Sequence, residues 1–202
     1  MTILLTISLV MFDCTHLFPV TLTAKWQANA ESALSPALKS WLFDSGSLTA
    51  RLKAHCHHFE VVVIGQAEQV CSEQEACQYI PAGEAMLVRE VLLLCDGKPQ
   101  VFARSLMPLS TLTGDEAFLG ELGNMPLGQA IFNSPYLTRG EFSVAKFSPQ
   151  SAVGQLAQQL SLPVQEALWG RRSIFFLHDK PLAVAEVFLP QAVAYQAMEA
   201  SA

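Results

Sequence analysis

Two arginines, Arg89 and Arg104, stand in apolar segments on either side of an Asp96-Gly97 pair. Asp-Gly between two apolar runs is a strong signal for a β-hairpin with a two-residue turn. Such a turn places Cys95 opposite Lys98, and counting back along both strands places Arg89 opposite Arg104. A three-residue loop would separate the two side chains onto opposite faces, whereas a four-residue loop would bring them together again.

Two arginines that face each other on a buried sheet face are energetically unfavourable unless another group compensates their charges. Like charges directly opposite each other repel, and burying them without a partner costs still more. The planar guanidinium presents donors in a fork that fits a carboxylate or a phosphate. The pattern therefore predicts an anion held between Arg89 and Arg104. The alternative is that each arginine pairs with a local acid such as Glu90, or lies on a solvated face.

Glu186 is a single carboxylate in the otherwise apolar segment 181–190. It is either a catalytic group or the partner of an ion pair. Burial would raise its pKa, whereas a nearby arginine would lower it. The structural alternative is a pair with Arg171 or Arg172, because buried acids normally need a partner.

Other groups of residues in the sequence are weaker candidates for a functional site. The segment His55-Cys56-His57-His58 contains metal-ligand types, but adjacent side chains on a helix or strand do not converge on one ion. Cys71 and Cys77 lack a matching second pair. The sequence contains no GxGxxG, Walker or GxSxG motif. We therefore expect neither a metal nor a nucleotide cofactor.

The chain of 202 residues fits one domain, with 51% hydrophobic and 15% charged residues. Its net charge of −6 argues against a nucleic-acid partner, which needs a basic patch. Five cysteines without a CxxC spacing favour a reducing compartment. The apolar stretch from Ile3 to Phe12 is too short to span a bilayer and lacks a basic flank. We expect a cytoplasmic monomer without membrane insertion.

Turn and cap signals divide the chain into short elements. Ser35-Pro36 and Ser47 each predict the start of a helix, and residues 113–123 have a capping-box spacing. Further helices are expected at 124–132 and within 148–166. Strands are expected at 59–64, in the arginine hairpin, at 138–147, and in a last hairpin at 172–176 and 182–189. Residues 67–83 should be a loop or a partly extended segment. This order predicts an α+β fold with a single antiparallel sheet and helices on one side.

Several motifs in one order resemble the chorismate pyruvate-lyase family, whose members make 4-hydroxybenzoate for ubiquinone synthesis. The resemblance covers about residues 35–190, so we expect 1–34 to be an N-terminal extension and 191–202 a C-terminal tail. The segment 148–166 is longer than or diverged from the family pattern. The family-like stretches are 87–99 (LVREVLLLCDGKP), 103–114 (ARSLMPLSTLTG), 122–128 (LGNMPLG), 137–139 (LTR), 168–173 (LWGRRS), 180–182 (KPL) and 186–190 (EVFLP).

The resemblance implies a lyase without cofactor or metal that acts on chorismate, releases pyruvate and retains its aromatic product. It also implies a six-stranded antiparallel sheet with a buried site under helical flaps. Arg89 stands where the family holds a substrate carboxylate, and Arg104 where a second basic contact lies. Glu186 matches the carboxylate near the ring hydroxyl, Leu127 a backbone contact, and Leu48 an apolar or backbone contact. Arg89 and Glu186 are thus the expected catalytic residues.

A second interpretation comes from another functional class. The effector domains of some bacterial transcription regulators resemble the same fold and bind small ligands without catalysis. Such proteins carry a DNA-binding helix-turn-helix ahead of the domain. The stretch before Ser35 is short and not basic, so we expect no such element there.

Overall fold

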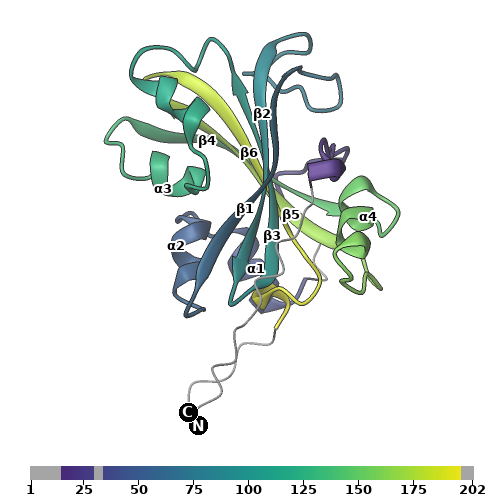
Figure 1. Cartoon of the computed structure of the whole chain (residues 1–202). Coiled ribbons are helices and arrows are strands. Elements are labelled where there is room, and N and C mark those ends of the chain that lie inside the picture. Colours follow the sequence, from purple (N-terminus) through teal and green to yellow (C-terminus); the bar gives the residue numbers. More distant parts are fainter. Residues whose placement is uncertain (1–14, 30–33, 197–202) are drawn as a thin grey trace.

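The computed structural model describes residues 15–29 and 34–196, and its centre is one six-stranded antiparallel sheet (Figure 1). The strands lie in the order β1-β2-β3-β6-β5-β4, so the prediction of a single antiparallel sheet in an α+β fold is confirmed. The strands are β1 (Phe59–Val70), β2 (Ala85–Cys95), β3 (Lys98–Pro108), β4 (Leu137–Phe147), β5 (Leu168–Leu177) and β6 (Lys180–Phe188). The helices are η1 (Thr15–Leu17), α1 (Pro36–Leu42), α2 (Leu48–Lys53), η2 (Gly114–Glu121), α3 (Leu127–Ile131), α4 (Ala152–Gln159) and η3 (Val193–Tyr195).

Serine caps begin the first two helices, as the sequence predicts. The Ser35 side chain accepts a hydrogen bond from the Leu38 N–H at 3.2 Å, and Pro36 occupies the first turn of α1. The Ser47 side chain accepts from the Ala50 N–H at 3.3 Å. These caps fix where α1 and α2 begin beside the sheet.

The capping box predicted at Thr113 was wrong, although a short helix does form there. Thr113 makes no side-chain cap bond, and the segment after it is a 3₁₀ helix, η2. The Glu116 side chain, which a capping box would turn back onto the helix, bonds instead to His178 and Lys180. The segment 67–83, expected as a loop or a partly extended segment, is extended as far as Val70, where β1 pairs with β2. In both places contacts with residues distant in the sequence, and not the local sequence pattern, determine the structure.

The hairpin between β2 and β3 has the predicted two-residue turn but not the predicted register. Asp96 and Gly97 have φ angles of 49° and 74°, and Cys95 lies opposite Lys98. Beyond the turn the pairing shifts, because Leu94 lies opposite Pro99 and Leu93 opposite Val101, which leaves Gln100 as an extra residue. This β-bulge reverses the relation between the faces of the two strands for all residues that follow.

The bulge has a clear physical origin. Pro99 has no N–H to donate to the neighbouring strand. Gln100 bonds to the C-terminal segment instead of to β2: its carbonyl accepts from the Leu189 N–H, and its side-chain Oε1 accepts from the Val193 N–H, both at 2.9 Å. Arg89 consequently lies opposite Ser105, and Arg104 lies opposite Glu90. The prediction that Arg89 faces Arg104 was therefore wrong, and the two side chains point to opposite faces of the sheet.

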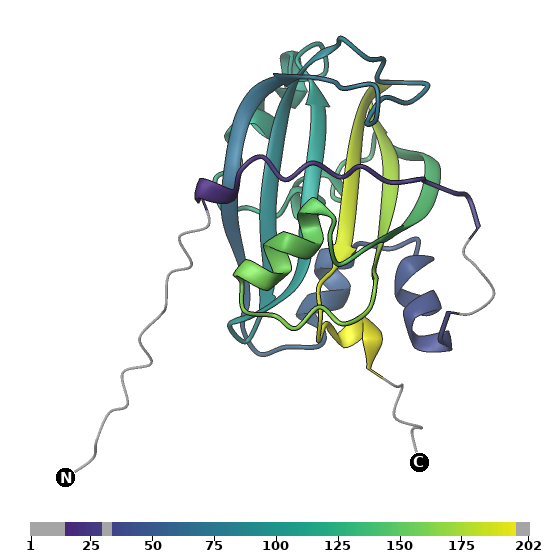
Figure 2. The same cartoon turned by 90° about the vertical axis from the view of Figure 1, so that its right-hand side faces the viewer.

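Both faces of the sheet are covered (Figure 2). Helices α1 and α2 pack on one face through a core that includes Trp41, Leu48 and Phe188, and η2 and α3 pack beside them. The other face carries α4 and the chain from Thr15 to Asn29, with Val20 and Leu22 buried against Phe102. Most helices thus share one face, as expected, and α4 lies on the other. No helix in residues 15–29 or 34–196 is long and apolar enough to cross a bilayer.

Candidate active site

A small cavity lies between the sheet and the two short helices α2 and α3. Leu48 of α2, Leu127 of α3 and Glu186 of β6 all line it, so the structure brings together three of the residues predicted to contact substrate. Its volume is about 20 Å³, which is room for about one water molecule. The cavity is therefore too small for a ring-sized ligand in this conformation.

Glu186 is held by Arg171 from the neighbouring strand. The two residues lie directly opposite each other, and Arg171 Nε donates to Glu186 Oε2 at 2.7 Å. Arg171 also donates from Nη1 to the carbonyl oxygens of Trp41 at 3.2 Å and Asp44 at 2.9 Å. The Glu186 side chain is 17% exposed and borders the cavity. This pair with Arg171 is the structural alternative that the sequence left open, and it leaves Oε1 of Glu186 available to a ligand.

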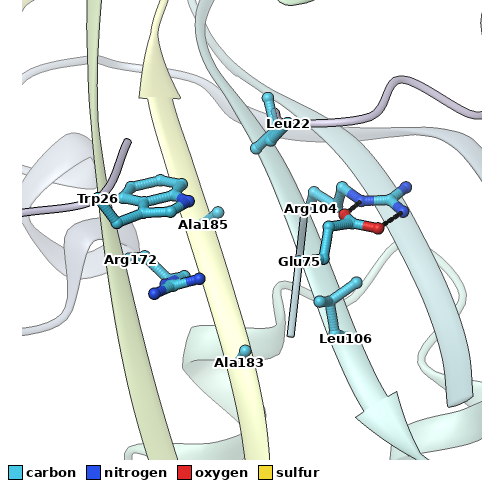
Figure 3. A pocket seen from close by; sticks show the side chains of 8 residues that line it. All are labelled: Leu22, Trp26, Glu75, Arg104, Leu106, Arg172, Ala183 and Ala185. Atoms are coloured by element: carbon cyan, nitrogen blue, oxygen red, sulfur yellow. Dashed lines mark hydrogen bonds and ion pairs between the residues drawn. The ribbon is translucent and has the colours of Figure 1, made fainter. Parts of the chain in front are cut away.

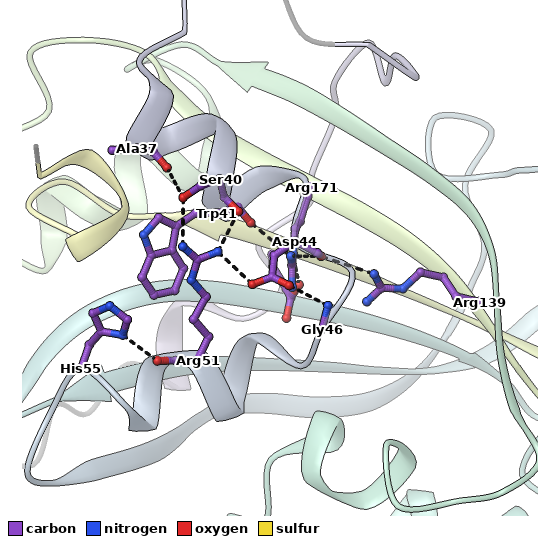
Figure 4. A network of polar contacts seen from close by, with 10 residues as sticks. Ala37, Ser40, Trp41, Asp44, Gly46, Arg51, His55, Arg139 and Arg171 are labelled. Atoms are coloured by element: carbon purple, nitrogen blue, oxygen red, sulfur yellow. Dashed lines mark hydrogen bonds and ion pairs between the residues drawn. The ribbon is translucent and has the colours of Figure 1, made fainter. Parts of the chain in front are cut away.

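A polar network surrounds the loop between α1 and α2 (Figure 4). Asp44 accepts from Arg51 Nη1 at 2.8 Å and from the Gly46 N–H at 2.7 Å. Burial raises the pKa of Asp44, but the Gly46 N–H and the Arg51 guanidinium outweigh it and hold that pKa below its ordinary value. Through the Asp44 carbonyl this network also anchors Arg171, so the covering loop and the Glu186 pair are one connected unit.

Arg89 lies on the same face as the cavity but does not line it. Its guanidinium is buried beneath the loop that leads into α3, where Nη2 donates to the carbonyls of Gly123 at 2.8 Å and Met125 at 3.1 Å. Its Nε has no hydrogen-bond partner within the described ranges. Burial lowers the pKa of Arg89, which means that the charged form lacks a nearby counter-charge. A buried cation with an unused donor is suited to an anionic ligand.

Arg104 lies on the opposite face, in a buried cluster of its own (Figure 3). Its Nε and Nη2 donate to the two carboxylate oxygens of Glu75 at 2.6 and 3.1 Å, and its Nη1 pairs with Glu90. Both oxygens of Glu90 also accept from the Val20 N–H at 2.9 Å. Arg104 thus joins the loop after β1, strand β2 and the N-terminal segment. The proposed clamp of Arg89 and Arg104 around one anion was wrong. The alternative of a local acid partner is confirmed for Arg104, which pairs with Glu90, whereas Arg89 donates to carbonyls.

The sequence analysis missed part of the cavity lining. Arg139 of β4 and Arg171 of β5 both border the cavity with Glu186. Arg139 belongs to the LTR stretch and Arg171 to the LWGRRS stretch, both of which the family resemblance singled out without assigning a ligand contact. Their grouping depends on the pairing of β4, β5 and β6, which no local pattern reveals. Among the residues that the structure describes, no three His, Cys, Asp or Glu side chains gather to hold a metal ion.

Solved structures of bacterial transcription regulators share the fold. PhnF from Mycobacterium smegmatis aligns with a TM-score of 0.55 at 15% sequence identity, over 79% of this chain and 71% of that one. Its separate effector domain aligns with a TM-score of 0.54 at 16% identity, over 73% of this chain and 90% of that one. At such low identity the likeness concerns the fold alone.

Sequence comparisons identify the relatives. A protein named "Probable chorismate pyruvate-lyase" from Pseudoalteromonas translucida is 45% identical over 183 residues, which is 88% of this chain and 98% of that protein. One of the same name from Psychromonas ingrahamii is 42% identical over 178 residues, covering 88% of this chain and 96% of its own length. The sequence model of the family described as "Chorismate lyase" matches residues 20–198. With a match that spans the whole sheet, both of its covered faces and the Glu186 cavity, this chain belongs to the chorismate lyase family.

Proposed function

We infer that this protein is a chorismate pyruvate-lyase, which converts chorismate to 4-hydroxybenzoate and pyruvate for ubiquinone biosynthesis. The observation that carries this function is the family match over residues 20–198. The cavity that groups Leu48, Leu127 and Glu186 supports it from the structural side.

The reaction needs little besides orientation and charge. Chorismate is a dianion with one carboxylate on the ring and one on the enolpyruvyl group. The ring loses its C4 proton, the C3–O bond breaks, and the electron pair of the C–H bond completes the aromatic ring. The enolpyruvate that leaves takes up a proton and becomes pyruvate. The protein must hold the dianion, accept a proton and stabilise the charge on the leaving oxygen.

Arg89 and Glu186 would hold the two ends of the ring. Glu186 accepts a hydrogen bond from the 4-hydroxyl or takes the C4 proton with its free Oε1. The ring carboxylate lies para to that hydroxyl, so its partner belongs on the same face of the sheet at a distance from Glu186. Arg89 is two strands away from Glu186, because β3 lies between β2 and β6. Its unpartnered Nε supports the assignment of Arg89 to the ring carboxylate.

Leu48 and Leu127 belong to the cover of the site. Leu127 begins α3, so its backbone N–H is among those that a helix leaves without an internal acceptor. Leu48 begins α2 and is buried over the cavity. We propose that α2 and α3 open to admit chorismate and close over it. Closure would also slow the departure of the aromatic product.

A direct assay tests the function. The purified protein is incubated with chorismate, and 4-hydroxybenzoate and pyruvate are followed by absorbance and by a coupled pyruvate assay. We expect equal amounts of both products. An Arg89→Gln variant should lose about ten- to a hundredfold in kcat/KM and bind 4-hydroxybenzoate more weakly, because a charge-assisted hydrogen bond to the retained carboxylate is lost.

The alternative function is a ligand-binding module without catalysis. The shared fold of the regulator effector domains is the observation that favours it. In that case calorimetry would detect binding of chorismate while no product forms. We also propose that the protein is a cytoplasmic monomer. The four described cysteines are unpaired, which suits a reducing compartment, and sedimentation would report the oligomeric state.

A further inference from the structure

We propose that Arg139 binds the second carboxylate of the substrate, the one on the enolpyruvyl group. This inference rests on the proposed function and assigns the contact that Arg104 cannot make. Arg139 borders the same cavity as Glu186 and lies on β4, three strands away from β3.

An irregularity in the sheet and two aromatic rings position the Arg139 side chain at the cavity. The pairing of β4 with β5 shifts between Arg139 and Phe142, and such an irregularity redirects the side chains at that point. The Arg139 guanidinium carbon lies 4.8 Å from the centre of the Phe175 ring and 5.8 Å from that of Phe132. Contact with two aromatic faces holds the planar group at the cavity wall without using its N–H donors.

Those donors are almost unused. Within residues 15–29 and 34–196, the one hydrogen bond of Arg139 runs from Nη1 to the Asp44 carbonyl and is 3.4 Å long. The two neighbouring arginines do have carboxylate partners: Arg51 pairs with Asp44, and Arg171 pairs with Glu186. Three arginines therefore share two carboxylates, and of the two that border the cavity, Arg139 is the one without a carboxylate partner within the described ranges. Burial, and after it the charge of Arg171, lower the pKa of Arg139, and the charges of Glu186 and Asp44 offset this only in part, so a bound anion would further stabilise the charged guanidinium.

The position of Arg139 matches the shape of chorismate. The enolpyruvyl oxygen is attached at C3, next to the C4 that carries the hydroxyl. With the hydroxyl at Glu186, the second carboxylate belongs close to Glu186, and Arg139 lines the same cavity as Glu186, whereas Arg89 does not line it. As the C3–O bond breaks, negative charge grows on the enolpyruvate beside Arg139, so the same contact stabilises the leaving group.

The product separates the roles of the two arginines, because 4-hydroxybenzoate keeps the ring carboxylate and lacks the enolpyruvyl one. In an Arg139→Gln variant we expect kcat/KM for chorismate to fall about ten- to a hundredfold. We expect the Kd of 4-hydroxybenzoate, measured by calorimetry, to change less than about twofold, since its contacts remain. Arg139→Lys should recover part of the loss because it keeps the charge without the fork.

Arg172→Gln is the matched control. Arg172 is adjacent to Arg171 on β5, lies on the opposite face, and also packs on an aromatic ring, that of Trp26, at 4.9 Å. It should leave both measurements unchanged. Normal chorismate kinetics in Arg139→Gln would overturn the inference, and so would an equal loss of product affinity, which would mean that Arg139 only shapes the cavity. A wild-type protein that forms no product would instead contradict the proposed function.

Discussion

Arg171 and Glu186 face each other across β5 and β6, with Nε and Oε2 2.7 Å apart. The same guanidinium donates to two carbonyls of the α1 end and the loop after it. The carboxylate therefore has one oxygen fixed by a buried cation and the other directed at the cavity. Such an arrangement orients a hydrogen-bond acceptor, which suits proton transfer at a fixed ring position.

Replacing Glu186 tests that role. Glu186→Gln keeps the size of the side chain and an acceptor for Arg171 but removes the base. We expect kcat for chorismate to fall by about a hundredfold or more, the range for loss of general-base catalysis. Steady-state kinetics on protein with a native circular dichroism spectrum is the measurement. If kcat stayed normal and KM alone rose, Glu186 would be a hydroxyl anchor and not the proton acceptor.

Replacing Arg104 should affect stability more than substrate contact. Arg104→Met leaves the buried carboxylates of Glu75 and Glu90 without their shared cation. Removing one partner of a buried ion pair costs about 3–5 kcal/mol in unfolding free energy. Urea denaturation measures this loss, and Arg51→Met, at a more exposed pair with Asp44, should cost about 1 kcal/mol or less. A KM for chorismate raised as strongly as in Arg89→Gln would contradict the placement of Arg104 outside the cavity.

Acid sensitivity should depend on Glu116, which ties η2 to the turn between β5 and β6. Hydrogen bonds from Lys180 and then His178, each 2.6 Å long, hold the pKa of Glu116 below its ordinary value of 4.5. A carboxyl group with a lowered folded-state pKa stabilises the protein above its unfolded-state pKa, and this contribution disappears as the pH falls through the folded-state pKa. The stability difference between wild type and Glu116→Gln should be largest at pH 7 and vanish in strong acid.

Urea denaturation of both proteins from pH 7 down to pH 3 is the measurement for Glu116. A difference that stayed constant over this range would show that the interaction does not involve the charge of Glu116. Asp115→Asn, one residue away in η2 and exposed, is the control and should show the pH dependence of the wild type.

Gly65 should not tolerate a side chain. A Cβ atom at this position of β1 would lie 2.3 Å from Cγ of Phe18, which belongs to the segment that crosses the second face of the sheet. Gly65→Ala must displace Phe18, and we expect a loss of about 1–3 kcal/mol in unfolding free energy, as for other overpacked sites. Gly120→Ala, whose Cβ would meet only Leu87 at 3.9 Å, is the control and should be close to neutral. Equal stability of Gly65→Ala and wild type would contradict this packing.

Local chemistry determined much of what could be foreseen from the sequence. Ser35 and Ser47 each cap a helix by accepting a hydrogen bond from the N–H three residues further along. Asp96 and Gly97 form a tight turn because of their own backbone preferences. The ordered motifs also identified the family and placed Leu48, Leu127 and Glu186 in one site. Each of these features depends on residues that are close together in the sequence or on the order of the motifs, so it can be predicted from the sequence.

The tertiary structure alone decided which arginines face the cavity. Gln100 bulges because its hydrogen-bonding partners are Leu189 and Val193, about ninety residues further along the chain, and this one extra residue sends Arg104 to the other face. Arg139 reaches Glu186 only through the pairing of β4, β5 and β6. A side-chain period of two makes the face of every strand residue depend on register, and here distant contacts set the register.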